Sequence, residues 1–325
     1  MNIPRRRFLH FAAATGALAI APCLARAQSY PSRPITLVVF VPAGGAPDIV
    51  ARLVSQALSQ RLGQPVVIEN RPGGGGNLAL QAVARAPADG HTLLLVATPH
   101  AVNVTLYPKQ DINVLRDIVP IASIDNDAFA MVVNPSIPAK TVAEFVAYAK
   151  ANPGKINMAS SGSGNLSHLA GELFKMMTGA GMVHVPYRGM PAANTGVMTG
   201  EAHVLFNALP AVVPLIKDGK LRALAVTSET AVKILPGVPT VGASVPGYAV
   251  TGSLGFGAPK GTPPEIIERL NKEINAVLAD PAIVSRLANI GSEPFTSSPA
   301  EFGKFIAAET EKWAKVVKFA NLKVN

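Results

Sequence analysis

Two strand-to-helix turns carry the residues best suited to bind a small anion. The first contains Gly44 and Gly45, and the second contains Ser161, Ser163 and Asn165. Glycine lets a ligand approach backbone N–H groups closely, and the first N–H groups of a helix have no internal partner and favour negative charge. Hydroxyl and amide side chains add hydrogen-bond donors. The second turn is therefore predicted to bind an anion. The first turn has the same backbone features, but its pattern alone favours an aspartate that only caps the helix and glycines that only turn the chain.

Covalent and metal chemistry are not indicated. Cys23 is the only cysteine and falls in a predicted export signal, which excludes disulfides, thiolate metal sites and a thiol nucleophile from the mature chain. The histidines lack tight metal-ligand spacing. The turn around Ser163 lacks the glycine pattern of a hydrolase elbow, and the glycines at 73–76 fit neither a dinucleotide nor a phosphate-loop motif. We expect no metal, no cofactor and no catalytic residue.

Strands and helices must position the two turns. The apolar run 35–41 predicts a buried strand before the first turn, and apolar residues at helical spacing over 50–62 predict a helix after it. A second series of strands and helices begins at Ile156 and repeats this plan. Such repeats predict parallel sheets with right-handed crossovers, and hence two α/β lobes.

The chain is expected to cross between the lobes twice, near 125–135 and near 245–258, and two crossings make a hinge. The helices predicted at 263–279 and 299–320 have no third sheet to cover. We therefore expect both of them to return to the first lobe.

Composition indicates an exported globular protein. The 325 residues are 49% hydrophobic and 15% charged, enough for a sizeable core. Residues 1–27 have the basic start, apolar run and small-residue end of an export signal, and the twin-arginine and ordinary secretory routes both stay open. Loss of its four arginines lowers the net charge from +9 to +5, without the basic patches that nucleic acid needs. A lipid anchor on Cys23 is disfavoured by the preceding proline.

Four motifs together resemble one known family. In order along the chain they are VPAGGAPDIVAR (41–52), VIENRPGGGGN (67–77), ASSGSGNLSHLAGE (159–172) and HVPYRG (184–189). Each is weak alone, but four at fitting distances after an export signal are specific. The mature chain resembles the Bug family, the periplasmic solute receptors of tripartite tricarboxylate transporters.

The resemblance implies a type II periplasmic binding protein: an α/β, two-lobe, Venus-flytrap fold that holds a carboxylate in the cleft and is not an enzyme. It implies a soluble periplasmic monomer that binds a small carboxylate and the membrane permease subunits, and no nucleic acid. The implied lobes are 28–128 with 250–325, and 129–249. Matching of motifs places the ligand contacts at Gly44, Gly45, Ala46, Pro47, Asp48, Asn77, Thr98, Ser160, Ser161, Gly162, Ser163, Gly164, Asn165, His168, Tyr187 and Asn207.

Two departures from the family pattern affect specificity. Phe40-Val41 stands where the family commonly has Pro-Phe, so an aromatic wall is expected to be missing or shifted. Gly196 and His203 stand where acidic residues are common. The candidate ligands are citrate-like tricarboxylates, C4 dicarboxylates, acidic amino acids and aromatic acids, the last faintly disfavoured by the loss of an aromatic wall.

The sequence is also compatible with two other functions. A sensory receptor would present the same closed state to a signalling partner. A secreted enzyme would use Asp48, His168 and a serine of the 160–163 run as acid, base and nucleophile, because residues distant in sequence can meet in the fold.

Overall fold

The computed structural model describes residues 30–290 and 292–322. The predicted export signal and Cys23 lie outside these residues. Among the helices described, none is both long enough and apolar enough to cross a membrane.

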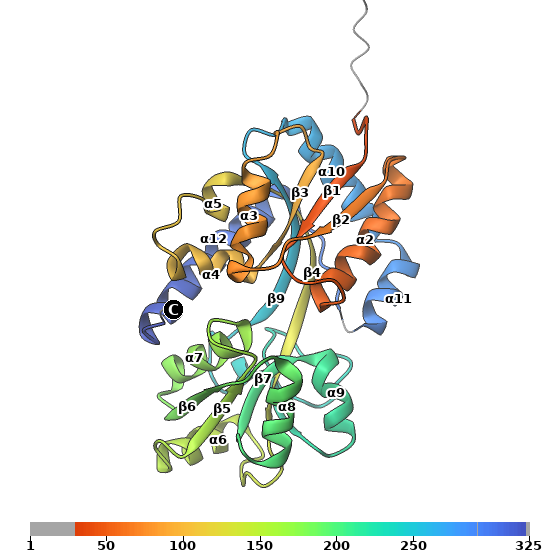
Figure 1. The fold of residues 1–325 in the computed structure, drawn as a ribbon. Helices are drawn as coiled ribbons and strands as arrows, with labels where there is room; N and C mark the ends of the chain where they lie inside the picture. Colours follow the sequence, from red (N-terminus) through yellow and green to blue (C-terminus); the bar gives the residue numbers. More distant parts are fainter. Residues whose placement is uncertain (1–29, 291, 323–325) are drawn as a thin grey trace, which may run out of the picture.

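One continuous path of strands runs through both lobes (Figure 1), in the order β2-β1-β3-β9-β4-β7-β5-β6, with β8 paired to β4. Strands β1, β2 and β3 are parallel to one another, as are β5, β6 and β7. The predicted parallel sheets are therefore present in each lobe. The strands are β1 (Ile35–Val39), β2 (Val66–Asn70), β3 (Thr92–Ala97), β4 (Ile118–Val133), β5 (Ile156–Ser160), β6 (Met182–Pro186), β7 (Val204–Ala208), β8 (Arg222–Val226) and β9 (Thr251–Pro259).

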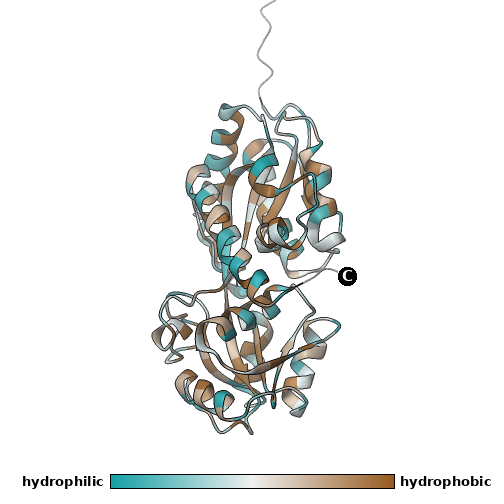
Figure 2. Ribbon diagram, turned by 90° about the vertical axis from the view of Figure 1, so that its left-hand side faces the viewer, coloured by the Kyte–Doolittle hydropathy of each residue, from teal (hydrophilic) through white to brown (hydrophobic). Residues whose placement is uncertain are grey.

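Helices cover both faces of these sheets, and the strands between them are mostly hydrophobic (Figure 2). The buried residues are largely apolar. The helices of the first lobe are α2 (Ala46–Leu62), α3 (Asn77–Ala84), α4 (Thr98–Leu106), α5 (Val114–Asp117), α10 (Pro264–Leu278), α11 (Pro281–Asn289) and α12 (Pro299–Phe319). Those of the second lobe are α6 (Val142–Ala151), α7 (Leu166–Thr178), α8 (Met190–Thr199) and α9 (Leu209–Lys217).

Strand β4 forms most of the link between the lobes. Its first part pairs antiparallel with β9, and from Phe129 onwards it pairs with β7 and β8 of the second lobe. The register between β4 and β9 shifts after Pro120, where the missing N–H cannot donate to the ladder. The two crossings predicted from the sequence are therefore one antiparallel pair of strands (Figure 1).

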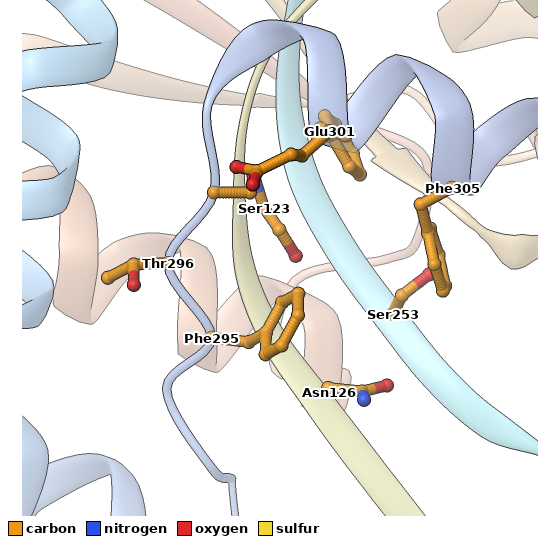
Figure 3. Close-up of a pocket in the computed structure, with 9 residues that line it drawn as sticks. Ser123, Asn126, Ser253, Phe295, Thr296, Glu301 and Phe305 are labelled. Atoms are coloured by element: carbon orange, nitrogen blue, oxygen red, sulfur yellow. The ribbon is translucent and has the colours of Figure 1, made fainter.

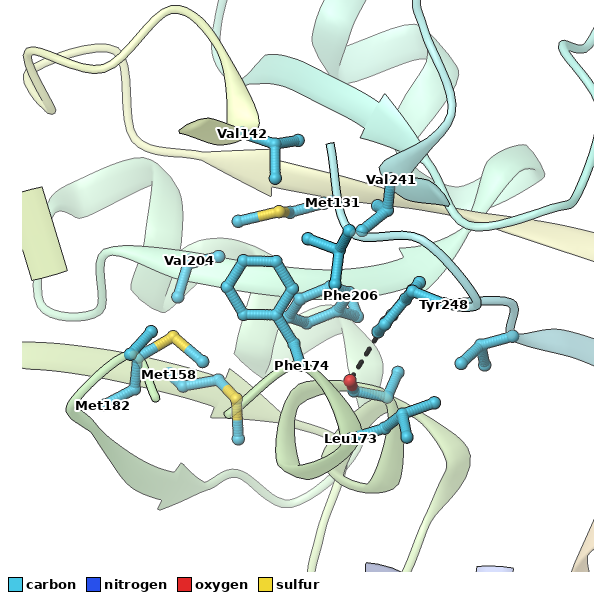
Figure 4. Packing of buried hydrophobic residues seen from close by; sticks show 14 of the residues in the cluster. Met131, Val142, Met158, Leu173, Phe174, Met182, Val204, Phe206, Val241 and Tyr248 are labelled. Carbon is cyan, nitrogen blue, oxygen red and sulfur yellow. Dashed lines mark hydrogen bonds between the residues drawn. The ribbon is translucent and has the colours of Figure 1, made fainter. Parts of the chain in front are cut away.

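The second lobe is built on an aromatic core (Figure 4). Phe174 of α7 packs at 5.7 Å from Phe206 and at 6.0 Å from Tyr248, measured between ring centroids. The Tyr248 hydroxyl donates to the Ala170 carbonyl at 3.0 Å, which satisfies the one polar atom of that ring. This core fixes helix α7, and with it the turn that precedes the helix.

Helix α12 packs on both lobes, whereas from the sequence we expected it to return to the first lobe. Phe302 and Ile306, near its start, pack in a first-lobe core cluster, as predicted. Trp313 and Val316, two turns later, belong to the core cluster that includes Phe174 of the second lobe. An apolar stripe of 21 residues is long enough to reach both cores, so α12 is a third segment that joins the lobes.

We predict that Trp313→Ala will lower the free energy of unfolding by about 3–5 kcal/mol, because the indole is 0% exposed and its removal leaves a large cavity. Urea unfolding followed by circular dichroism would measure this, since Trp313 is the only tryptophan and fluorescence would be lost. The control is Lys315→Ala on the exposed face of the same helix, expected within ~0.5 kcal/mol of the parent. Equal effects of the two substitutions would contradict the bridging role of α12.

Candidate functional site

The two predicted anion-binding turns lie at the carboxyl ends of β1 and β5, where parallel α/β sheets usually bind ligands. Residues of both lobes line one cleft of about 260 Å³ there. The second lobe contributes Ser163, Gly164 and Asn165. The first lobe contributes Phe40, Val41, Pro42, Pro72, Gly73, Gly75, Gly76, Pro99, Asn103, Leu106 and Tyr107.

The first turn is held by a buried carboxylate. Gly44 has a φ of +83°, which favours glycine, and its N–H donates to Asp48 Oδ2 at 2.8 Å. The same oxygen accepts from Arg52 Nε at 2.8 Å, and Oδ1 accepts from Asn70 Nδ2 at 2.8 Å. The Asp48 side chain is only 1% exposed. Asp48 therefore shapes the turn from inside the protein and does not line the cleft.

Asp48 is ionised despite its burial. Burial raises its pKa, but the hydrogen bonds from Arg52, Asn70 and the Gly44 N–H outweigh burial and lower the pKa to about 2. The carboxylate charge lies at the start of helix α2, where the helix dipole also favours it.

The second turn leads into helix α7, whose N-cap residue is Asn165. No side chain caps this helix, because the Asn165 amide instead donates to the Ser161 carbonyl at 3.1 Å. Ser163 and Asn165 are exposed on the cleft. The start of α7 therefore offers the cleft a helix dipole without a capping side chain.

Two stacked imidazoles support the second turn. His168 is buried, and its Nδ1 accepts from the Gly164 N–H at 3.1 Å. Its ring stacks on His184 with 3.5 Å between centroids and 9° between planes. His184 Nε2 lies 2.6 Å from the hydroxyl of the buried Ser160, and burial, followed by the adjacent His168, lowers the pKa of His184 to about 4. Ser160 and His168 therefore position the turn and do not line the cleft.

Four other predicted contact residues do not line the cleft. Asn77 Oδ1 accepts from Asn103 Nδ2 at 3.0 Å, and Thr98 Oγ1 accepts from the backbone N–H of Ser253 at 3.4 Å. Asn207 is buried and donates to Asn194 Oδ1 at 2.9 Å. The fourth, Tyr187, packs over a glycine of α8.

The departure from the family pattern in the second lobe, at Gly196 and His203, has a structural explanation. A Cβ added at Gly196 would lie 2.3 Å from the Tyr187 hydroxyl oxygen, so glycine makes room for this phenol ring. His203 Nδ1 accepts from the Asn157 N–H at 2.8 Å, and burial lowers the pKa of His203. Both residues have structural contacts within the second lobe, and neither lines the cleft.

The motifs did not reveal several lining residues. Asn103 and Leu106 lie on α4 and Tyr107 follows it, and no helix was predicted there because Thr98-Pro99-His100 reads as the end of a strand. Phe40 also lines the cleft, in edge-on contact with His100 at 5.1 Å. The cleft therefore has an aromatic ring in its first-lobe wall, supplied by Phe40.

A separate cavity of about 240 Å³ lies beside the hinge strands (Figure 3). Phe295, Phe302 and Phe305 line it, together with Ser123 of β4 and Ser253 of β9. None of the residues predicted to bind ligand lines this cavity. Within residues 30–290 and 292–322, no group of three or more His, Cys, Asp and Glu side chains is placed to hold a metal ion.

The catalytic alternative gains no support from the described contacts. Asp48 is committed to Gly44, Arg52 and Asn70 in the first lobe, whereas His168 contacts Gly164 and the second-lobe helix. Among the described hydrogen bonds, none joins Asp48, His168 and a serine of the 160–163 run in a relay.

Comparison with known proteins gives one consistent answer. Residues 50–322 match the family model described as "Tripartite tricarboxylate transporter family receptor". Protein BugT of Bordetella pertussis is 37% identical over 301 residues, which cover 92% of each chain. The structure of R. palustris Rpa4515 with adipate has a TM-score of 0.77 at 36% identity, covering 90% of this chain and 99% of that one. MatC (Rpa3494) from Rhodopseudomonas palustris with bound malate has a TM-score of 0.74 at 30% identity, covering 89% and 100%. The predicted two-lobe periplasmic-binding-protein fold is confirmed.

We predict that Asp48→Asn will destabilise the protein in a pH-dependent way. The folded pKa of about 2 lies below the ordinary value of 3.8, so the ionised carboxylate stabilises the fold above about pH 4, and this contribution is lost as the pH falls towards 2. The substitution should cost roughly 2 kcal/mol at pH 7, and the difference from the parent should shrink below pH 4. Urea unfolding at pH 7, 5, 4 and 3 would measure it.

The matched control is Asp218→Asn, because Asp218 forms an ion pair with Lys220 in which both side chains are 57% exposed. This change is expected to lie within ~0.5 kcal/mol of the parent at every pH. A cost of Asp48→Asn that did not vary with pH would contradict an ionised, hydrogen-bonded Asp48.

Proposed function

This chain belongs to the tripartite tricarboxylate transporter receptor family, and from that premise we propose that it captures a small carboxylate between its lobes and delivers it to the permease subunits of such a transporter. It is a solute-binding receptor, and its function needs binding and release but no covalent chemistry. Adipate and malate in two similar proteins support a carboxylate as the ligand class.

The start of helix α7 on the cleft is the observation that carries the proposal. Ser163, Gly164 and Asn165 line the cleft at the positive end of a 13-residue helix that no side chain caps. A carboxylate there would accept hydrogen bonds from backbone N–H groups, and each charge-assisted bond contributes about 1.5–3 kcal/mol net. A few such bonds give micromolar affinity.

Closure of the lobes follows from where the ligand would bind. A carboxylate at Asn165 lies across the cleft from Phe40 and Tyr107 of the first lobe. A ligand that contacts both walls binds the closed form better than the open form, and so shifts the population towards closure. The closed form is the state that a permease would distinguish from the empty receptor.

We also propose the export signal, the cellular location, the lobe boundaries and the roles of the turn residues, which the family match does not specify. Residues 1–27 act as an export signal, and the mature protein works as a periplasmic monomer. The lobes are 28–128 with 250–325, and 129–249, with α12 also packed on the second lobe. Gly44, Gly45, Ala46 and Pro47 form the opposing turn, with Asp48 and His168 as positioning residues.

We predict that Asn165→Asp will weaken carboxylate binding while the fold is kept. Aspartate is as good an N-cap residue as asparagine, but its charge would occupy the start of α7 and repel a carboxylate. A thermal-shift screen of residues 28–325 against adipate, malate and benzoate would identify the best probe, since a ligand at 100 times its Kd stabilises by about 2.7 kcal/mol. Calorimetric titration should then show at least a ~10-fold loss of affinity in the variant.

The matched control is Thr141→Asp, which makes the same kind of N-cap change at helix α6, away from the cleft. This variant should bind the probe like the parent. If Asn165→Asp kept full affinity, the carboxylate would not lie at α7. If no acid stabilised the parent while a neutral sugar did, the carboxylate proposal would be wrong.

A further inference from the structure

The two walls of the cleft differ in polarity. The second-lobe wall consists of Ser163, Gly164 and Asn165 at the start of α7. The first-lobe wall is largely apolar, and its largest side chains are those of Phe40, Leu106 and Tyr107. Among the described residues that line the cleft, none is Lys, Arg, Asp or Glu. One end of a ligand would therefore meet hydrogen-bond donors and the other a hydrocarbon surface.

The turn on the first lobe already holds an anion of its own. The Asp48 carboxylate occupies the start of α2 and takes the Gly44 N–H, while Arg52 balances its charge. Pro47 has no N–H to offer within the first turn of the helix. A buried side chain also takes a glycine N–H at the second turn, but there it is the His168 ring, and the first turn of α7 holds no acidic residue. A ligand carboxylate is therefore favoured at the start of α7, where no carboxylate of the protein repels it.

Asn103, a polar residue that also lines the first-lobe wall, cannot replace that lost site. Asn103 Nδ2 donates to the Gly75 carbonyl at 2.9 Å and to Asn77 Oδ1 at 3.0 Å, so both of its N–H donors are used inside the protein. A second ligand carboxylate against Phe40 and Leu106 would lose its hydration without gaining a charged partner.

Resting on the proposed function, we infer that this receptor selects a monocarboxylate with a compact apolar body, such as a single ring, over dicarboxylates and tricarboxylates. The carboxylate binds at the start of α7, and the ring packs against Phe40, Leu106 and Tyr107. The volume of about 260 Å³ lies just below the roughly 300–1,000 Å³ typical of drug-sized pockets, which fits a small ligand. The edge of the Phe40 ring is fixed by its contact with His100, so the apolar wall is preformed.

Calorimetric titration of the parent with matched acids tests this inference. Benzoate and cyclohexanecarboxylate should bind at least ~10-fold more tightly than adipate and malate, and neutral benzamide should bind more weakly than benzoate. Adipate or malate binding as tightly as the ring acids would overturn the inference and leave the proposed function intact. Failure of every acid to bind would instead overturn the proposed function itself.

Two variants locate the apolar end of the ligand. Phe40→Ala should weaken benzoate at least ~10-fold, while Phe319→Ala, which removes a ring that is 52% exposed outside the cleft, should leave benzoate affinity unchanged. Leu106→Lys places a cation at the apolar wall and should reverse the preference in favour of adipate. Melting temperatures of the ligand-free variants establish whether they fold. If Phe40→Ala does not fold, Leu106→Lys alone tests where the apolar end of the ligand binds. Unchanged ranking of benzoate and adipate in a folded Leu106→Lys protein would overturn the inference.

Discussion

The antiparallel pairing of β4 with β9 is the constraint on which the rest of the molecule depends. Both lobes are continuous with this one ladder, so its register decides which loops face each other. Thr227 fixes the second-lobe end, because its hydroxyl accepts from the Phe129 N–H and donates to the Val250 carbonyl at 2.6 Å. Near the middle, the buried Asp125 accepts from the Leu254 N–H and from the Ser292 hydroxyl, and burial followed by the neighbouring Asp127 raises its pKa. Polar groups inside the ladder thus tie both strands to the loop before α12.

Each lobe makes its cleft turn rigid by different chemistry. The first lobe uses an ionised carboxylate, Asp48, with a guanidinium and an amide as partners. The second lobe uses His168 and His184, whose stacked rings link Gly164 to the buried Ser160. In both, a buried side chain takes the N–H of a glycine at the turn. Hydrogen-bond donors and cleft walls that are already in place reduce the conformational entropy lost on binding. A cleft that is not lined by a cation can therefore still bind an anion.

Much of the fold and part of the site could be predicted from sequence, for identifiable reasons. The apolar stripes of α2 and α7 and the buried runs of β1, β3 and β5 are strong periodic signals, and glycines mark the turns between them. Helix α4 was missed because Pro99 and several β-branched residues weaken its helical pattern, and the lining residues on it were missed with it. Spacing also cannot show that Asp48 turns inwards to Asn70, since that contact joins residues 22 apart. The motifs located the turns but could not separate residues that line the cleft from those that support it.

Helix α12 limits how the lobes can move. An apolar stripe predicts that a helix is buried but does not tell which core it enters, and here Phe302 and Trp313 enter different ones. Trp313 lies in a cluster with Val102 of α4 and Leu169 of α7, so separating α4 from α7 would expose a large aromatic surface. Opening that left Trp313 covered would have to pivot close to this residue.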